Sequence, residues 1–277
     1  MKALQTSWKG YLSFTLENRF GKTVVKDKQH FGPLVLQRAY YQEEERPTIL
    51  VIHPPGGIVA GDELTTQVLL KPNAKVFIST PAATKFYRST GACAVQLQQL
   101  TLYENTQLEW LPQEALFFNQ CKVRNHLQFN LMTEQAALIA WDVVGFGRPA
   151  MNEVFSEGEL HQKIEIRLAD KPIFIDQFVF RNIPELMHNA FALNGQTLMA
   201  TMLFYQSDAQ LLSQLKEQFL QQDWAPQCGI TLVDKVLVLR TLDSDLDDLK
   251  ARLIAAWQLA RPLIIGAPPL MPRIWKT

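Results

Sequence analysis

A histidine, two carboxylates and a run of prolines and glycines lie within one stretch, His53-Pro-Pro-Gly-Gly-Ile-Val-Ala-Gly-Asp-Glu. Gly56 and Gly61 have the spacing of a phosphate-binding loop, but that motif continues with Lys and then Ser or Thr. Asp62 and Glu63 follow Gly61 here, and two carboxylates would repel a phosphate. We therefore reject nucleotide binding at this loop. Proline fixes φ and glycine allows left-handed values, so the stretch predicts a tightly specified turn.

His53 could act as a base or a metal ligand, or it could make a structural hydrogen bond to the turn. The chain has 5 histidines and 3 cysteines. No two histidines have the three- or four-residue spacing of a local metal pair, and none stands beside a cysteine. The sequence predicts no closed metal site, while a weak, transient, carboxylate-rich site stays open.

Neither the carboxylates of this stretch nor other patterns provide catalytic machinery. Asp62 and Glu63 are adjacent, and neighbouring side chains on a strand point to opposite faces, so they do not form an acid–base pair. Asp62 can instead hydrogen-bond the backbone of its own turn. The chain has no Gly-x-Ser-x-Gly elbow, and no cysteine has surroundings that would activate it as a nucleophile.

Two further groups of polar residues stand at corners of the chain. The first follows an expected strand and consists of Lys85, Tyr87 and Arg88. The second surrounds another glycine-rich corner, Gly145-Phe-Gly-Arg-Pro, and consists of Asp142, Arg148 and Glu153. If the corners meet, both signs of charge come close together. The cluster would be either a salt-bridged network or the mouth of a polar cleft or channel, and spacing does not decide between them.

The overall charge and hydrophobic content limit the classes of function that fit this chain. Lys+Arg and Asp+Glu both number 27 among 277 residues, so the net charge is zero and nothing in it suggests electrostatic capture of nucleic acid or an anionic membrane. A hydrophobic fraction of 47% with 16 Phe and 6 Trp can fill a core and still cover a partner.

Cysteine usage and the N-terminus predict the compartment. Cys93, Cys121 and Cys228 are far apart and odd in number, which favours a reducing compartment over a disulfide framework. The N-terminus, Met-Lys-Ala-Leu-Gln-Thr-Ser-Trp, lacks the apolar core of a signal peptide, and no apolar run approaches membrane-spanning length. We therefore expect a cytoplasmic protein.

Alternation of apolar and polar residues predicts half-buried strands along most of the chain. Its apolar positions are Leu12, Phe14 and Leu16; Leu34 and Leu36; Val123, Leu127, Phe129 and Leu131; and Leu160, Ile164, Ile166 and Leu168. A looser repeat of strand, turn and strand begins at Leu70, Leu102 and Leu131, and Leu168 is the candidate for a fourth copy. Stacked solenoid units and an ordinary antiparallel meander both explain this repeat.

The last third predicts helices. Leu211, Leu212, Leu215 and Phe219 have helical spacing within 208–222, and Leu246, Leu249, Leu253 and Trp257 repeat it after Asp243 and Ser244, either of which could cap the helix. Between them Ile230 to Arg240 predicts one strand, and Arg261 to Thr277 predicts an extended, proline-rich apolar tail. We expect one domain over 1–277, mainly β to residue 206, built as a β-helical solenoid or as layered antiparallel sheets, with two helices in the C-terminal third.

At these same corners the chain resembles the urease accessory protein UreD family (UreH in some bacteria). The matching backbone corners are His53, Pro54, Pro55, Gly56, Gly57, Gly61, Thr80, Lys85, Tyr87, Arg88, Gly147 and Arg148. Gly32-Pro33-Leu34 and Leu111-Pro112 match as well, over roughly Trp8 to Phe180. One departure is Asn152 before Glu153, where the family has glycine. Asn tolerates left-handed backbone, so we expect this corner to survive.

The resemblance implies a scaffold rather than an enzyme, with a β-helical fold. Such proteins bind UreF, which carries the GTPase UreG, and the assembly docks on apo-urease and assists delivery of Ni²⁺ to it. A nickel route needs hydrated, weakly binding carboxylates, and we expect Asp62, Asp142 and Glu153 to line or border it, with no tightly bound cofactor. The alternative for these carboxylates is that they only brace the fold.

Two other functions stay open at this point. A solenoid-type carbohydrate-active enzyme could use carboxylates such as Asp62 and Glu153, although it would need a cleft with convergent carboxylates and aromatic platforms. A protein-interaction module without any metal role would differ only in whether nickel enters the assembly.

Overall fold

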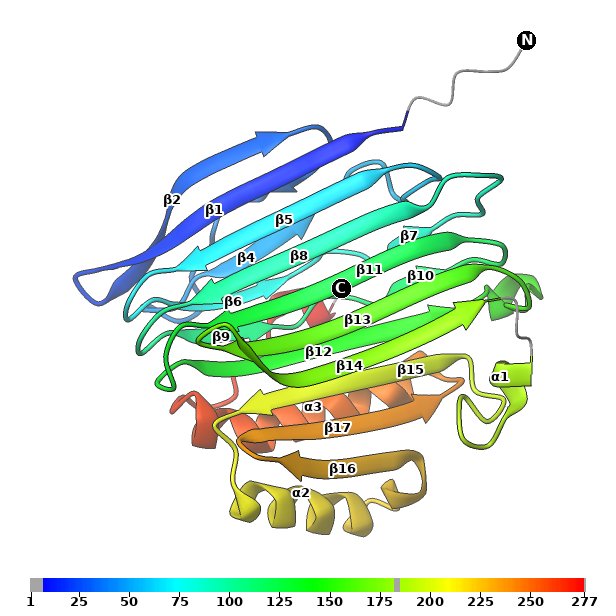
Figure 1. Cartoon of the computed structure of the whole chain (residues 1–277). Coiled ribbons are helices and arrows are strands. Elements are labelled where there is room, and N and C mark those ends of the chain that lie inside the picture. The colour runs from blue at the N-terminus through cyan, green and yellow to red at the C-terminus, as the bar shows by residue number, and fades with distance from the viewer. Residues whose placement is uncertain (1–6, 182–184, 277) are drawn as a thin grey trace.

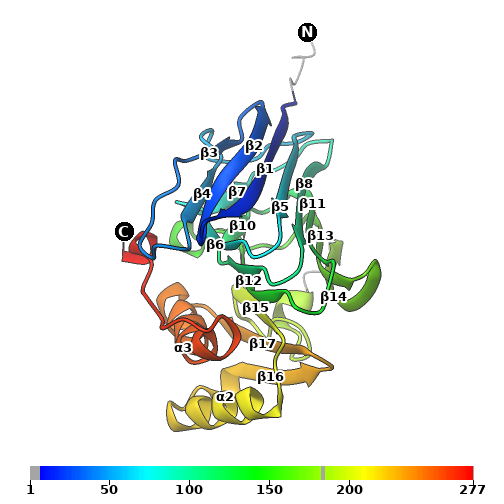
Figure 2. The same cartoon turned by 90° about the vertical axis from the view of Figure 1, so that its left-hand side faces the viewer.

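The computed structural model describes residues 7–181 and 185–276, in which the strands form two facing sheets (Figure 1). Viewed from the side, one sheet stands alone, while helices cover the lower part of the other (Figure 2). Residues 1–6, where we expect no signal peptide, lie outside the described residues. No helix in the described part of the chain is both long and apolar enough to cross a membrane.

The seven-stranded sheet is built mainly from parallel pairs. Its strands, in spatial order, are β14 (Lys171–Arg181), β13 (Glu159–Leu168), β11 (Lys122–Leu131), β8 (Ala94–Leu102), β5 (Glu63–Leu70), β1 (Lys9–Arg19) and β2 (Lys22–Phe31). All pairs from β13 to β1 are parallel, and only the edge strands β14 and β2 are antiparallel to their neighbours. The alternation predicted for three of these strands is confirmed, with the apolar residues facing inward.

The ten-stranded sheet faces the first one and continues beyond it. Its main path is β16 (Cys228–Val233), β17 (Val236–Asp243), β15 (Leu198–Tyr205), β12 (Ala137–Phe146), β9 (Gln107–Trp110), β6 (Lys75–Ser79), β4 (Thr48–Ile52) and β3 (Val35–Leu36). Off this path, β10 (Ala115–Phe117) pairs with β12, and β7 (Thr84–Phe86) pairs with β10. The strands from β4 to β12 pair in parallel.

The chain passes from one sheet to the other at each repeated turn, which confirms the solenoid interpretation. The turns after Leu70, Leu102 and Leu131 join β5 to β6, β8 to β9 and β11 to β12. Asn73 and Asn105 occupy the same place in the first two turns, and both adopt left-handed backbone that Asn tolerates. The antiparallel alternative holds only at the sheet edges and around β15 to β17.

The fourth proposed copy was wrong. Leu168 ends β13 and leads into β14, its antiparallel neighbour in the same sheet, so this turn closes a hairpin instead of crossing to the other sheet. Ala169 and Asp170 both have positive φ, as a two-residue hairpin turn requires. A leucine followed by a polar turn does not reveal which sheet the next strand joins.

The two helices of the last third are confirmed as α2 (Ala209–Gln221) and α3 (Leu246–Ile264), and α1 (Glu185–His188) is one short turn. The prediction that Asp243 or Ser244 caps α3 was wrong, because Asp245 accepts from the amides of Asp247 and Asp248. The single strand predicted from Ile230 to Arg240 is a hairpin of β16 and β17, turning at Asp234 with φ 52°. Alternation alone does not show a turn inside an apolar run.

The extended tail begins later than predicted, because α3 continues through Pro262 to Ile264. The buried side chains of Arg261 and Ile265 hold this last turn against the protein. The following segment packs on this chain: Trp275 stacks on Trp141 at 5.0 Å and meets Trp257 edge-on at 5.1 Å. Short 3-10 turns occur at Pro149–Met151, Ala225–Gln227 and Arg273–Lys276.

Two apolar cores lie on opposite sides of the ten-stranded sheet. One fills the space between the two sheets, and the other lies between the ten-stranded sheet and the helices α2 and α3. In β12, Ala140 and Val144 belong to the inner core while Trp141 and Val143 face the helices. Asp142 has the parity of Ala140 and Val144, so its carboxylate faces the space between the sheets.

Candidate functional site

The loop from His53 to Asp62 is fixed by its own carboxylate and by strand β7. Asp62 Oδ2 accepts from the Val59 amide at 3.0 Å, and its Oδ1 accepts from the Trp8 amide at 2.8 Å. The Ile58 amide donates to Lys85 O at 2.7 Å. Asp62 is 3% exposed, so both bonds are shielded from water. The expected bond to the loop's own backbone is present, and the carboxylate braces the loop.

Glycine is required in this loop for steric and backbone reasons. A Cβ on Gly57 would lie 2.0 Å from Cε2 of the Tyr87 ring. Gly56 and Gly61 have φ values of 80° and 84°, which side chains rarely adopt. The loop and the segment that carries Tyr87 are therefore fitted to each other.

The segment of Tyr87 and Arg88 and the corner of Arg148 and Glu153 meet at a surface pocket of about 440 Å³. Tyr87 packs edge-on against Phe118 at 5.1 Å between ring centroids, and the Arg148 guanidinium lies 4.5 Å above the Phe118 ring. Glu153 pairs with Arg148, with 3.0 Å between Nε and Oε2, and also accepts from the Asn119 amide. These contacts form the salt-bridged cluster that was one of the two interpretations, around a pocket that Arg88 also lines.

Glu153 and Asn152 keep this second corner in shape. Burial would raise the pKa of Glu153, but the Arg148 guanidinium and the Asn119 amide hold it below its ordinary value. Asn152 has φ 56°, so it takes the left-handed backbone that Asn tolerates. A Cβ on Gly147 would lie 2.5 Å from Glu153 O, which explains why glycine stands there.

A second cavity, of about 380 Å³, lies between the two sheets, and polar residues line its inner end. The amides of Gln96, Asn125 and Gln162 stand side by side on strands β8, β11 and β13, because Asn125 is in register with both of the others. Thr66 and Gln98 form the next layer of the same inner face. Apolar side chains of the inner core lie on both sides of these polar layers.

Asp142 projects from the opposite sheet toward this row of amides. Gln162 Nε2 donates to Asp142 Oδ2 at 2.6 Å. Burial raises the pKa of Asp142 to about 6, against the lowering effect of this bond, and the charge of Asp176 adds to the rise. Asp142 lines the cavity, and its burial there disfavours the charged form of the carboxylate.

Several polar atoms around this cavity have no hydrogen-bond partner within residues 7–181 and 185–276. They are Nε2 of His53, Oδ1 of Asn125 and Oε1 of Gln162. Leaving a buried polar group unpaired costs about 1–3 kcal/mol, so three of them around one cavity indicate a space suited to water or a polar ligand. Burial also lowers the pKa of His53, which keeps its imidazole neutral near pH 7.

The cavity is bordered by the corner loops that the sequence singled out. His53, Pro54 and Gly56 line it together with Thr80 and Lys85. Among the described residues no group of three His, Cys, Asp or Glu side chains could hold a metal ion tightly. The oxygen atoms that line the cavity belong to one carboxylate, to amides and to hydroxyls.

The three carboxylates expected along one path lie in three different surroundings. Asp142 lines the interior cavity, Glu153 lines the surface pocket, and Asp62 is held by backbone amides and lines neither. Sequence reasoning missed the amides of Gln96, Asn125 and Gln162. The available signal was a polar residue inside an apolar alternation: Asn125 between Val123 and Leu127, and Gln162 between Leu160 and Ile164.

Comparison with known proteins assigns the family. The model of the UreD urease accessory protein family matches residues 9–276. Urease accessory protein UreD of Klebsiella pneumoniae subsp. pneumoniae is 37% identical over 277 residues, covering 99% of this chain and 97% of that relative. UreD of Klebsiella aerogenes is 36% identical with 99% and 98% covered, and UreD of Escherichia coli is 34% identical with 98% of both covered. This chain therefore belongs to the UreD family of urease accessory proteins.

Proposed function

We propose that this chain is a non-catalytic cytoplasmic scaffold for urease maturation that binds UreF, UreG through UreF, and apo-urease. We further propose that its interior cavity forms part of a route for hydrated Ni²⁺. The observation that carries the second proposal is the row of amides facing Asp142 between the two sheets.

The chemistry of this lining suits a passing ion rather than a bound one. Amide and hydroxyl oxygens hydrogen-bond the water shell of a divalent cation, and a single carboxylate attracts the charge without closing a coordination sphere. Cys and His ligands would hold nickel tightly, and Cys93, Cys121 and Cys228 do not line this cavity. The imidazole of His53, near its border, is the one nitrogen ligand of the lining that is suited to binding a metal.

The cavity does not favour the carbohydrate-enzyme alternative. Glycoside hydrolysis needs two carboxylates across the scissile bond and usually aromatic platforms for the sugar. Asp142 is the only carboxylate among the described residues that line the cavity, and no Phe, Tyr or Trp lines it. The proposal of a scaffold without catalytic activity rests on this lining and on the family.

The first test is co-expression of the tagged chain with UreF, UreG and the urease subunits from its source, followed by affinity purification and native mass spectrometry. We expect a complex that contains UreF and apo-urease. A well-folded chain that purifies without any of them would overturn the scaffold proposal.

The second test separates the nickel route from the scaffold. Asp142→Asn keeps the size and the Gln162 contact but removes the charge, so we expect urease activation to fall while UreF and urease still co-purify. Asp62→Asn is the matched control, because Asp62 lies outside the cavity, and its activation should follow the amount of folded protein. Unchanged urease activation by the Asp142→Asn variant at normal protein levels would overturn the proposal of a nickel route. It would not affect the scaffold proposal.

A further inference from the structure

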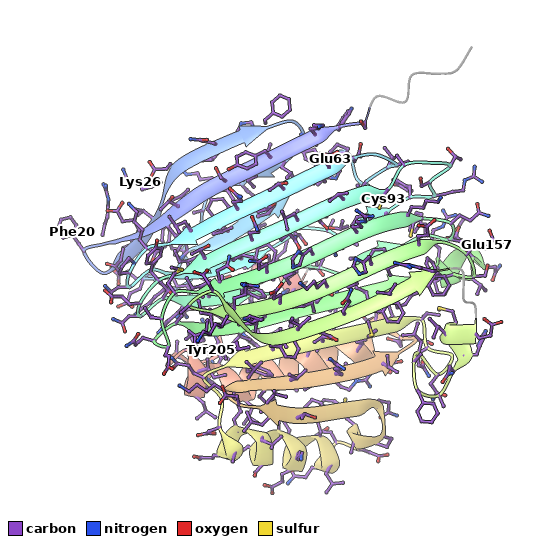
Figure 3. All side chains as sticks on the ribbon, viewed as in Figure 1. Phe20, Lys26, Glu63, Cys93, Glu157 and Tyr205 are labelled. Atoms are coloured by element: carbon purple, nitrogen blue, oxygen red, sulfur yellow. The ribbon has the colours of Figure 1, made fainter. Side chains whose placement is uncertain are left out.

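The outer face of the seven-stranded sheet carries a separate pocket of about 280 Å³, walled by strands β8, β11 and β13. Val95 and Leu97 form one side, and the remaining outward side chains are Arg124, His126, His161 and Lys163. In Figure 3 this face is turned toward the viewer and no helix lies across it. The pocket takes no part in the function proposed above.

The register of β11 and β13 places these four side chains in a compact block. Arg124 stands beside His161, and His126 stands beside Lys163, on two parallel strands. Neighbouring strands are about 4.8 Å apart, and alternate residues of one strand are about 6.6 Å apart. The block therefore measures about 5 by 7 Å at the backbone, so long side chains can converge on one small group.

The charges that face this block leave it positive. Glu165, also on β13, accepts from Lys163 Nζ and Arg167 Nη1, both at 2.6 Å, and lies 3.5 Å from His126 Nε2. A single carboxylate thus lies beside two permanently charged cations and a histidine. Arg124 has no ion pair with any described residue, so the block keeps an excess of positive charge even with neutral histidines.

The remaining neighbours do not offset this charge, because Glu159, next along β13, is already paired with Lys122 of β11 at 3.2 Å. Strand β8 contributes Val95 and Leu97, which are uncharged, and strand β14 contributes Gln177, whose amide contacts His161. Burial and the Lys163 charge lower the pKa of His126, while Glu165 raises it. His126 Nε2 is buried and makes no hydrogen bond within the described residues, and the Glu165 carboxylate lies 3.5 Å from it.

We propose that Arg124, His126, His161 and Lys163 form a binding site for a small oxyanion such as sulfate or phosphate. The block presents guanidinium, ammonium and imidazole donors, which form short charge-assisted hydrogen bonds with oxyanions. The same cations repel a metal ion. The balanced charge of the whole chain makes this local excess a specific feature of one pocket rather than a general attraction for polyanions.

The test uses the full chain with isotope-labelled histidine and NMR detection. The protein has 5 histidines, so one His→Gln variant for each assigns every signal. We expect sulfate, added at constant ionic strength, to shift the signals of His126 and His161 saturably while those of His30, His53 and His188 stay in place. Proportional drift of all the signals, or no saturable shift, would overturn the site.

Matched variants test which charges hold the anion. Arg124→Gln should weaken sulfate binding about tenfold, because it removes a charge-assisted donor. Lys28→Gln removes the same charge from the exposed edge strand β2 and should leave binding unchanged. Equal affinity in the Arg124 variant and the parent chain would contradict the proposal, and matching unfolding midpoints show that both variants fold.

Two further comparisons define the ligand. Sulfate keeps its charge between about pH 6 and pH 8, whereas histidine gains one on acidification, so we expect tighter binding at the lower pH. Binding that is no tighter at the lower pH would remove the histidines from the site. Acetate replaces sulfate in a parallel titration: stronger saturable binding of sulfate indicates a free tetrahedral anion, and stronger binding of acetate indicates a protein carboxylate. Failure of both anions to saturate would overturn the site and would leave the scaffold proposal untouched.

Discussion

Two buried carboxylates lie on opposite faces of the ten-stranded sheet, and their surroundings differ in almost every respect. Glu109 on β9 faces α3 and is fully enclosed: Trp257 Nε1 donates to it at 2.7 Å and Arg261 Nε at 2.9 Å, while Arg46 lies 3.5 Å away. Asp142 on β12 faces the cavity, and among the described residues Gln162 is its one side-chain donor. Glu109 is part of a closed ionic network, whereas Asp142 is only partly satisfied.

The difference separates a carboxylate that holds the fold from one that is free to interact. Arg261 also pairs with Glu43 and donates to Pro268 O, so the network around Glu109 joins α3, its following segment, β9 and the loop before β4. Removing one charged member of the network would leave the opposite charge unpaired in the interior. At Asp142 the cost of burial has already raised the pKa of the carboxyl group to about 6. Such a residue weakens the folded state at neutral pH, and carboxylates with raised pKa values cluster at functional sites.

The largest expected effect is at the closed network. Glu109→Ala leaves Arg46 and Arg261 buried with only the less buried Glu43 as a shared partner, and we expect the free energy of unfolding to fall by about 3–5 kcal/mol. Urea unfolding measures this. Glu104→Ala at an exposed turn is the control and should change the free energy by less than about 0.5 kcal/mol. Equal losses of unfolding free energy in the two variants would show that the Glu109 network does not hold the fold.

Asp142→Asn should change the free energy of unfolding in the opposite direction, so that the variant is more stable than the parent chain at neutral pH. Because the pKa of Asp142 lies above its ordinary value of 3.8, the folded chain holds the proton more tightly, and stability falls as pH rises from about 4 through about 6. A rise from 3.8 to about 6 corresponds to up to about 3 kcal/mol. The gain of the variant over the parent chain should therefore be near zero at pH 4 and largest above pH 7. A loss of stability at neutral pH would show that the carboxylate braces the fold as Glu109 does.

Replacing a third carboxylate, Asp62, should destabilise the fold as replacing Glu109 does, but by less. Asp62→Ala removes two shielded hydrogen bonds from backbone amides, and we expect a loss of about 2 kcal/mol in the free energy of unfolding. Glu63→Ala, one residue away, breaks only an exposed pair with Lys9 and is the control. If the two variants unfold at the same denaturant concentration, the loop does not depend on Asp62.

The smallest effect is expected at the surface corner. Glu153→Gln removes the ion pair with Arg148 but keeps an oxygen that can accept from the Asn119 amide. Because the pair is exposed, we expect a slight drop in the unfolding midpoint that disappears at high salt. Thermal unfolding at low and high ionic strength measures it. A drop that salt does not reduce would mean that the corner is held by a shielded interaction.

The sequence predicted those parts of the protein that local chemistry controls. The strands of the solenoid follow from the alternation of apolar residues, and their inward faces are confirmed. The corner residues Gly57, Gly147 and Asn152 follow from backbone and steric limits that act within a turn or between adjoining segments. The resemblance to the UreD family rests on such corners, Gly57 and Gly147 among them, and the match of the family model to residues 9–276 confirms it.

The tertiary structure alone decided which carboxylate lies where. Asp142, Glu153, Asp62 and Glu109 look alike in the sequence, but strand parity turns Glu109 toward α3 and Asp142 toward the cavity. The amides of Gln96, Asn125 and Gln162 come from separate turns of the solenoid, and only parallel pairing in register brings them together. The network of Glu109 joins residues more than 140 positions apart, Trp257 and Arg261 among them. Local residue types determine the path of the backbone, whereas the pKa, the partners and the role of a buried charge depend on groups that only folding brings near it.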